Sequence, residues 1–188
     1  MIFQRWKAVL KWCLLSTVIS QKKDVIYVVT YENRESIKKV AFSNGIVLDL
    51  FPDVQEIMFS HRQDIGSSAE AGGMLIGYEN VETGNFTVSG ATEPQPSDIR
   101  TRISLFLGHH HNNLLQHLET PYGYIGTWHT HPADVPVPSS TDLKDWKKSI
   151  KHNRKSTNAL IFIIAGTKGF RVWLCDSNSE ALFEGDVL

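Results

Sequence analysis

The chain has 188 residues, 41% of them hydrophobic, which suffices for one domain with a core and is short for two domains of ordinary size. Lys and Arg number 19 against 20 Asp and Glu, so the chain has no positive field that would hold nucleic acid. The two cysteines, Cys13 and Cys175, stand far apart. They favour neither a disulfide framework nor a thiolate zinc site, and we expect a cytoplasmic protein.

The N-terminus begins much as a signal peptide does, with basic residues before an apolar run. Lys11 and Trp12 interrupt that run, which is too short to span a bilayer. The polar residues 20–24 lack the small-residue pattern of a cleavage site. We therefore predict that residues 1–23 form an N-terminal extension or helix, without a membrane partner.

The first predicted elements alternate between strands and one helix. Residues 24–31 and 46–50 are rich in β-branched and other apolar side chains, which is typical of strands. Apolar residues then recur at three and four from Pro52 to about Gln63, which predicts an amphipathic helix. Two further strands, 73–78 and 85–91, are predicted to pair as a hairpin.

The middle of the chain is less regular. Residues 103–107 form an apolar run of ambiguous type, and leucines at 114–118 predict a short helix. Residues 124–131 are predicted to form a strand. Side chains alternate between the two faces of a strand, so four residues of this strand are expected to share one side: Ile125, Thr127, His129 and His131.

The C-terminal part completes an α/β pattern. A helix is predicted from about Ser139, with an apolar stripe of Leu143, Trp146 and Ile150. Residues 158–165 are almost continuously apolar, as in a strand covered on both faces. The alternating segment 170–175 is expected to pair with that strand, because a short turn separates the two.

Two histidines in the predicted strand 124–131 are spaced to bind one metal ion. Residues at i and i+2 of a strand project the same way with Cα atoms about 6.6 Å apart, so His129 and His131 can both reach one zinc at about 2.0–2.1 Å. Asp142 offers an oxygen from the first turn of the next helix. Two histidines, one aspartate and a water make an open, catalytic type of zinc site.

Hydrolysis at such a site also needs a group that moves protons. An uncoordinated carboxylate can take a proton from water and give it to the leaving nitrogen, and Glu70 is the candidate for this role. Ser139 could donate a hydrogen bond to the oxyanion formed during attack on a carbonyl. Helix capping by Ser139 and a solvated Glu70 are the alternatives without catalysis.

Other candidate ligands are weaker. Asp134 and Asp145 are alternative carboxylates to Asp142, but the spacing favours Asp142 and a ligand at Asp134 would be strained. Residues 109–111 are three consecutive histidines, which point apart on any regular element, so we interpret them as a polar loop or helix start near the substrate. His61, His117 and His152 are expected at the surface.

These residues resemble a known family. His129–Pro132 followed by Ser139 and Asp142 is similar to the complete JAMM (MPN-plus) motif of JAB-domain zinc metallopeptidases, and Glu70–Gly77 is similar to the family's upstream glutamate and glycine-rich strand. The resemblance covers residues 24–188. It implies an α/β fold with a central, mostly antiparallel mixed sheet flanked by helices, as in cytidine deaminases. It implies one Zn²⁺ per chain on His129, His131 and Asp142, with Glu70 as general acid/base and Ser139 steadying the tetrahedral intermediate.

Three further segments, 91–94, 98–102 and 126–132, resemble the prokaryotic JAB proteins more narrowly. Similar proteins occur in bacterial antiphage (CBASS) operons with an E1/E2-like conjugating enzyme and a cGAS-like nucleotidyltransferase, or with a ubiquitin-like modifier. The resemblance implies a deubiquitinase-like isopeptidase that frees a modifier, or the nucleotidyltransferase C-terminus, from a target amine. A catalytically inactive MPN scaffold and a JAMM hydrolase of small amides or sulfur-carrier precursors are the alternatives.

Overall fold

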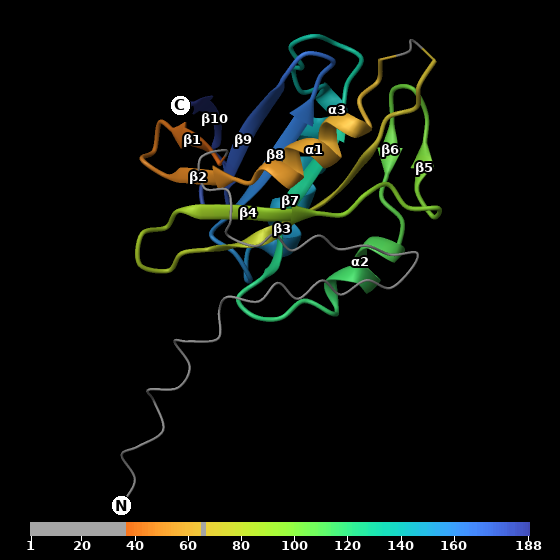
Figure 1. Cartoon of the computed structure of the whole chain (residues 1–188). Coiled ribbons are helices and arrows are strands. Elements are labelled where there is room, and N and C mark those ends of the chain that lie inside the picture. Colours follow the sequence, from red (N-terminus) through yellow and green to blue (C-terminus); the bar gives the residue numbers. More distant parts are fainter. Residues whose placement is uncertain (1–36, 65–66) are drawn as a thin grey trace, which may run out of the picture.

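The fold is built around one sheet whose strands close into a ring (Figure 1). The computed structural model describes residues 37–64 and 67–188. The extension predicted at 1–23 and the strand predicted at 24–31 lie outside these ranges. The strands of the ring are β1 (Lys38–Phe42), β2 (Val47–Leu50), β3 (Gly72–Glu79), β4 (Phe86–Ala91), β7 (Gly123–Thr130), β8 (Ala159–Ala165), β9 (Phe170–Asp176) and β10 (Leu182–Val187).

The strand order of the ring is β1-β10-β9-β8-β7-β3-β4-β2, and β2 pairs again with β1. Only the β2–β4 and β7–β8 pairs of this ring are parallel. The prediction of an α/β fold with a mixed, mostly antiparallel sheet is therefore confirmed. The predicted β3–β4 hairpin and the β8–β9 pair are present as well. No sequence prediction covered β1 or β10.

Three helices accompany the sheet in the described part of the chain: α1 (Pro52–Ser60), α2 (His110–Leu115) and α3 (Ser140–Asn153). Helix α1 has the expected proline in its first turn but stops before Gln63. Gln63 instead makes side-chain hydrogen bonds to the main-chain oxygens of Ser68 and Arg102. None of the helices in the described ranges is long and apolar enough to cross a membrane.

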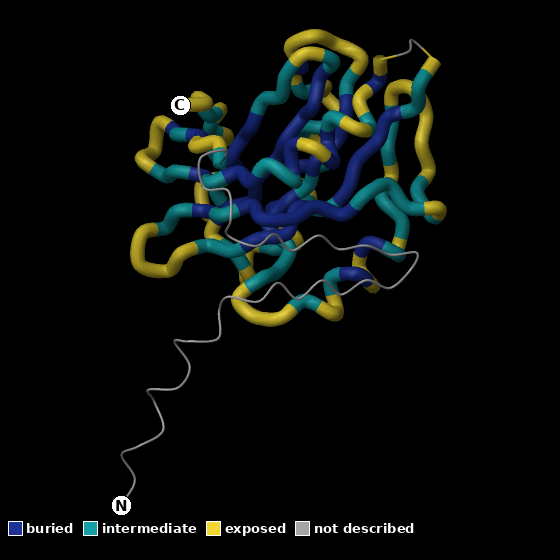
Figure 2. The backbone as a smooth tube through the Cα atoms, viewed as in Figure 1, coloured by how far each residue is buried: buried dark blue, intermediate teal, exposed yellow. Residues whose placement is uncertain are grey.

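Strand β8 is buried along its whole length, as its continuous apolar sequence predicted (Figure 2). Two apolar clusters cover its two faces. One cluster joins α1 to side chains from around the ring, including Ile161 and Ile163 of β8. The other packs Trp146 of α3 against the opposite face, where its ring stacks on Phe162 with centroids 4.6 Å apart. Helix α3 is thus fixed over β8 and β9, next to the end of β7.

Strand β7 departs from the predicted alternation. Its register with β3 shifts at Leu75/Ile76, beside Gly126, which has a positive φ of 149°. Because of this irregularity, Ile125 packs in the same apolar cluster as Trp128. The expectation that Ile125 shares a side with Thr127 and the histidines is therefore wrong, since strict alternation holds only in an uninterrupted strand.

A short two-stranded hairpin stands apart from the ring. It consists of β5 (Ile99–Arg100) and β6 (Leu105–Phe106), which pair with each other. The ambiguous run 103–107 is therefore part of a hairpin rather than a helix. Figure 1 shows this hairpin on the same side of the molecule as α2, and it contacts the chain just before β3 through Glu70.

Candidate metal centre

The two histidines meet at the end of β7. His129 is near the end of that strand, and His131 follows it with its main-chain N–H bonded to the Ala165 carbonyl of β8. Their Nε2 atoms lie 3.1 Å apart. The histidine side chains are mostly buried, with 10% and 15% exposure respectively. The predicted projection of both imidazoles to one side is confirmed.

Asp142 reaches the same point from the start of α3. Its Oδ1 lies 3.3 Å from His129 Nε2, and its Oδ2 lies 3.4 Å from His131 Nε2. A capping box orients this carboxylate: Ser139 N–H donates to Asp142 Oδ2 at 2.6 Å, and Asp142 N–H donates to Ser139 Oγ at 3.2 Å. The helix-capping role of Ser139 is therefore real. Its hydroxyl proton is still available for donation, since Oγ acts only as the acceptor in this bond.

These three groups lie close enough together to share one metal ion. Two ligands bound to zinc at about 2.0–2.1 Å with a tetrahedral angle lie about 3.3–3.4 Å apart. The two histidine nitrogens are 3.1 Å apart, and each Asp142 oxygen lies at a similar distance from one histidine, Oδ1 from His129 and Oδ2 from His131. His129, His131 and Asp142 thus form a group able to hold a metal ion. Burial would raise the pKa of Asp142, but hydrogen bonds from both histidines and the charge of His129 hold it well below its usual range. The carboxylate is ionised, as a ligand must be.

Glu70 faces this group without joining it. Its Oε1 is 4.0 Å from His131 Nε2, and its side chain is 8% exposed. It comes from the irregular segment just before β3. Burial raises the pKa of Glu70 to about 7, with His131 opposing and Asp142 adding to the shift. The alternative of a solvated Glu70 is wrong, since the carboxyl is buried beside the metal-binding group.

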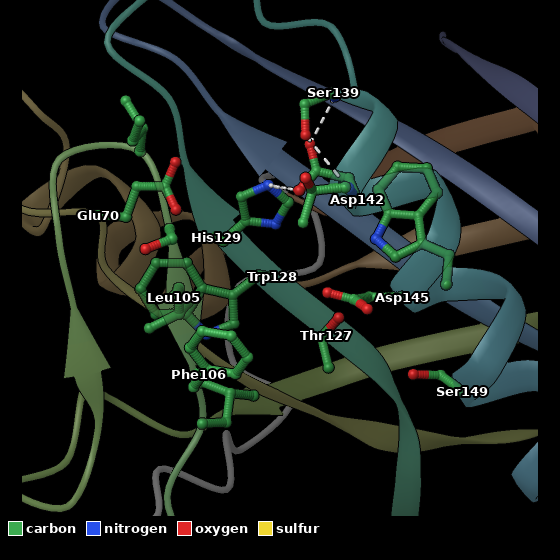
Figure 3. A pocket seen from close by; sticks show the side chains of 15 residues that line it. Glu70, Leu105, Phe106, Thr127, Trp128, His129, Ser139, Asp142, Asp145 and Ser149 are labelled. Carbon is green, nitrogen blue, oxygen red and sulfur yellow. Dashed lines mark hydrogen bonds and ion pairs between the residues drawn. The ribbon is translucent and has the colours of Figure 1, made fainter.

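A groove of about 260 Å³ runs past these residues. In Figure 3, Glu70 and the β6 side chains lie on one side of His129, and Asp142 and the α3 side chains lie on the other. Residues that line it include Glu70, Leu105, Phe106, Thr127, His129 and Asp142. Ile103 and Phe106 on the hairpin expose 80% and 63% of their surface. The groove therefore offers an apolar wall next to a polar reaction centre.

Sequence reasoning missed the polar contacts that hold these residues in place. Thr130, between the two histidines, is fully buried; its Oγ1 accepts Ala71 N–H at 2.9 Å, and its own N–H donates to Ala71 O at 2.8 Å. Thr130 Oγ1 also donates to Oε1 of buried Gln63 at 3.3 Å. The two bonds to Thr130 link Ala71, the residue after Glu70, to strand β7. A buried threonine or glutamine has no distinctive sequence spacing, so only the fold reveals it.

The structure also settles the other candidate ligands. Asp134 lies away from the centre and binds Thr167 and Lys168. Asp145 lines the groove, but its carboxylate pairs with Lys148 at 2.8 Å. His110 and His111 begin α2, as one interpretation of residues 109–111 predicted. His111 is fully buried, which that interpretation as a polar segment did not foresee. His61 is partly buried, whereas His117 and His152 are exposed as expected.

This architecture and this group define the class of protein: an α/β domain whose curled sheet presents a His-His-Asp metal-binding group with a buried carboxylate beside it. Residues 53–176 match the family described as prokaryotic homologs of the JAB domain. The chain belongs to that family.

The chain is also similar in sequence to curated isopeptidases. A CD-NTase/cGAS isopeptidase of Escherichia coli is 34% identical over 138 residues, covering 71% of this chain and 82% of the relative. A Vibrio cholerae protein of the same name is 32% identical, covering 66% of this chain and 78% of the relative. Among solved structures, a protein from Desulfitobacterium hafniense matches with a TM-score of 0.45 and 17% identity over 72% of this chain and 87% of that one. Family and relatives place the chain among the peptidases.

Proposed function

We propose that this protein is a zinc-dependent isopeptidase of bacterial CBASS antiphage defence. It hydrolyses the amide that joins a modifier, or the C-terminus of a cGAS-like nucleotidyltransferase, to a target. The observation that carries this proposal is the convergence of His129, His131 and Asp142 into one possible metal-binding group, with the buried Glu70 carboxyl 4.0 Å from His131 Nε2. The names of the E. coli and V. cholerae relatives supply the substrate class.

The chain's own residues divide the work of hydrolysis. Zinc held by the three ligands would supply a Lewis acid that polarises the amide carbonyl and acidifies water. Glu70, too far from the ligand group to be a ligand itself, accepts the proton of the attacking water and delivers it to the leaving nitrogen. The Ser139 hydroxyl, on the opposite side of the group in Figure 3, donates to the oxyanion.

The groove suits a peptide tail. An extended chain can pair with an exposed strand edge through main-chain hydrogen bonds, and β6 borders the groove through Leu105 and Phe106. The exposed Ile103 and Phe106 would cover apolar side chains of the tail. We expect an E1/E2-like conjugating enzyme to act as operon partner by forming the bond that this protein breaks.

Replacement of Glu70 tests the proposal. Glu70→Gln is expected to slow cleavage of a nucleotidyltransferase conjugate by about 10²–10⁴-fold, because the amide cannot carry the proton. Zinc content, measured by elemental analysis of protein purified without added metal, is expected to stay near one per chain. A chelator should abolish wild-type cleavage, and added zinc should restore it. Glu82→Gln, at an exposed turn, is the matched control.

Three results would contradict the proposal. Full activity of Glu70→Gln would remove Glu70 from the reaction. Protein that purifies without zinc, and gains no activity when zinc is added, would favour the catalytically inactive scaffold. Cleavage of small amides but not of the conjugate would favour the hydrolase of small amides.

A further inference from the structure

The position of Glu70 is fixed through its main chain. Glu70 precedes β3 and belongs to no helix or strand. Its N–H donates to the Thr101 carbonyl at 2.7 Å, and its carbonyl accepts from Arg100 Nε at 2.6 Å. Both main-chain polar groups of Glu70 are therefore bonded to the β5–β6 hairpin. The hairpin therefore holds the main chain of Glu70 itself, whereas the ring of strands holds the next residue, Ala71, through Thr130.

The hairpin itself is anchored by a buried chain of hydrogen bonds. Asp98, next to β5, pairs with His111 Nε2 at 3.0 Å, and neither side chain is exposed. His111 Nδ1 lies 2.6 Å from Thr92 Oγ1, which in turn accepts Met74 N–H of β3 at 2.8 Å. Asp98 Oδ1 also accepts Gly108 N–H at 2.8 Å. The two ends of the hairpin are thus tied to each other through Asp98, and Asp98 is tied through His111 and Thr92 to α2 and β3.

We propose that Arg100 is a positioning residue that holds Glu70 at its working distance from the metal-binding group. The inference rests on the proposed function, because it assigns a purpose to the placement of Glu70. A guanidinium donor makes a charge-assisted hydrogen bond, which is stronger and shorter than a neutral one. The Arg100 side chain contacts the carbonyl of Glu70 rather than its carboxylate. It therefore places the acid/base without pairing with it.

This arrangement predicts which kinetic constant changes. Loss of the Arg100 bond frees the carbonyl of Glu70 and lets its carboxyl drift. A displacement of about 1 Å at a reacting group costs up to about 10²-fold in rate. The three metal ligands lie on β7, the loop after it, and α3, so zinc binding should not change. The hairpin wall of the groove stays in place through Asp98 and His111, so substrate binding should change little.

The test compares Arg100→Ala, Arg100→Lys and Arg102→Ala. Arg102 is an exposed neighbour whose main-chain oxygen, not its side chain, accepts from Gln63, which makes it the matched control. Amide hydrogen exchange at Glu70 and Ala71 is the first readout and needs no activity. Arg100→Ala should speed this exchange by about 10-fold or more. Arg102→Ala should leave it unchanged, and Arg100→Lys, which keeps a cationic donor, should restore part of the protection.

Kinetics on the conjugate provide the second readout. Arg100→Ala is expected to lower kcat by about 10–10²-fold with KM within about twofold, and Arg100→Lys to recover part of kcat. Unchanged exchange at Glu70 in Arg100→Ala, or a fall confined to KM, overturns the inference. Wild-type protein without zinc-dependent cleavage would contradict the proposed function instead. The exchange measurement would still decide the role of Arg100.

Discussion

Asp142 serves two purposes at once. Its Oδ2 accepts the main-chain N–H of Ser139, which caps α3, and both its oxygens face the histidines. A carboxylate near a helix N-terminus is also favoured by the partial positive charge there. Because capping fixes the rotamer, this carboxylate would already be oriented toward the histidines when a metal ion binds. The same bonds explain why the pKa of Asp142 is low despite burial.

Ser139 caps α3 and is also proposed to bind the oxyanion. Substitution of Ser139 by glycine distinguishes these two roles. Ser139→Gly keeps an acceptable N-cap and should cost only a few tenths of a kcal/mol of stability, whereas Ser139→Ala should cost about 1 kcal/mol. Both variants lose the hydroxyl, so kcat should fall about 10²-fold in each. Urea denaturation and conjugate cleavage measure the two effects. Wild-type kcat in Ser139→Gly would reduce Ser139 to its capping role.

At the scale of elements, the irregularity in β7 decides which side chains lie on the α3 side of the sheet and which lie in the inner apolar cluster. Downstream of Gly126, Thr127 and His129 face α3, whereas Trp128 packs in the inner cluster and donates from Nε1 to the Thr92 carbonyl at 3.0 Å. Gly126 adopts a φ of 149° and lies directly against Ile161 of β8. A Cβ at this position would collide with the Ile161 carbonyl. The strand that carries His129 and leads into His131 therefore depends on one glycine.

Gly126→Ala should destabilise the protein by about 3 kcal/mol, because strained backbone and overpacking each cost about 1–3 kcal/mol. Gly123→Ala is the control on the same strand: a Cβ there would meet no atom within 4 Å. That substitution should leave stability unchanged or slightly raised. Urea denaturation of the two variants checks this. Equal stability would mean that β7 tolerates a side chain at its irregularity.

At the scale of the whole molecule, His111 couples stability to pH. Burial lowers the pKa of His111, although the adjacent Asp98 opposes that shift and His110 adds to it. The unfolded chain therefore binds a proton that the folded chain resists as the pH falls through about 6.5. The stability that depends on neutral His111 is complete above that pH. Below about pH 6.5, this contribution to the free energy of unfolding declines by at most about 1.4 kcal/mol per pH unit.

The comparison of wild type with His111→Gln isolates this effect. In metal-free protein, the difference in free energy of unfolding between the two should narrow by about 1 kcal/mol between pH 7.5 and 5.5. Exposed His117→Gln is the control and should show a constant difference from wild type. Urea denaturation at each pH measures it. If the difference in free energy of unfolding between wild type and His111→Gln stays constant with pH, His111 has the same pKa in the folded and unfolded chain.

Sequence alone determined the parts of the site that local geometry controls. The i, i+2 spacing on a strand brought His129 and His131 together, and the first turn of a helix supplied Asp142. Continuous or alternating apolar residues located β8, β9 and α3, because burial imposes those periods. The roles of the site residues and the boundary at residue 24 stay predictions.

Only the tertiary structure decided what depends on distant segments. The closure of the ring by β1 and β10 pairs residues far apart in the chain, through Val40 and Val187. The hydrogen bond from Arg100 to the Glu70 carbonyl and the buried Asp98–His111 pair likewise join segments that no hydrophobic periodicity in the sequence connects. A hydrogen bond depends on where two groups lie in space, and a sequence pattern reports only which side of its own element a residue faces. The convergence of His129, His131 and Asp142 could therefore be predicted, but the contacts that position Glu70 could not.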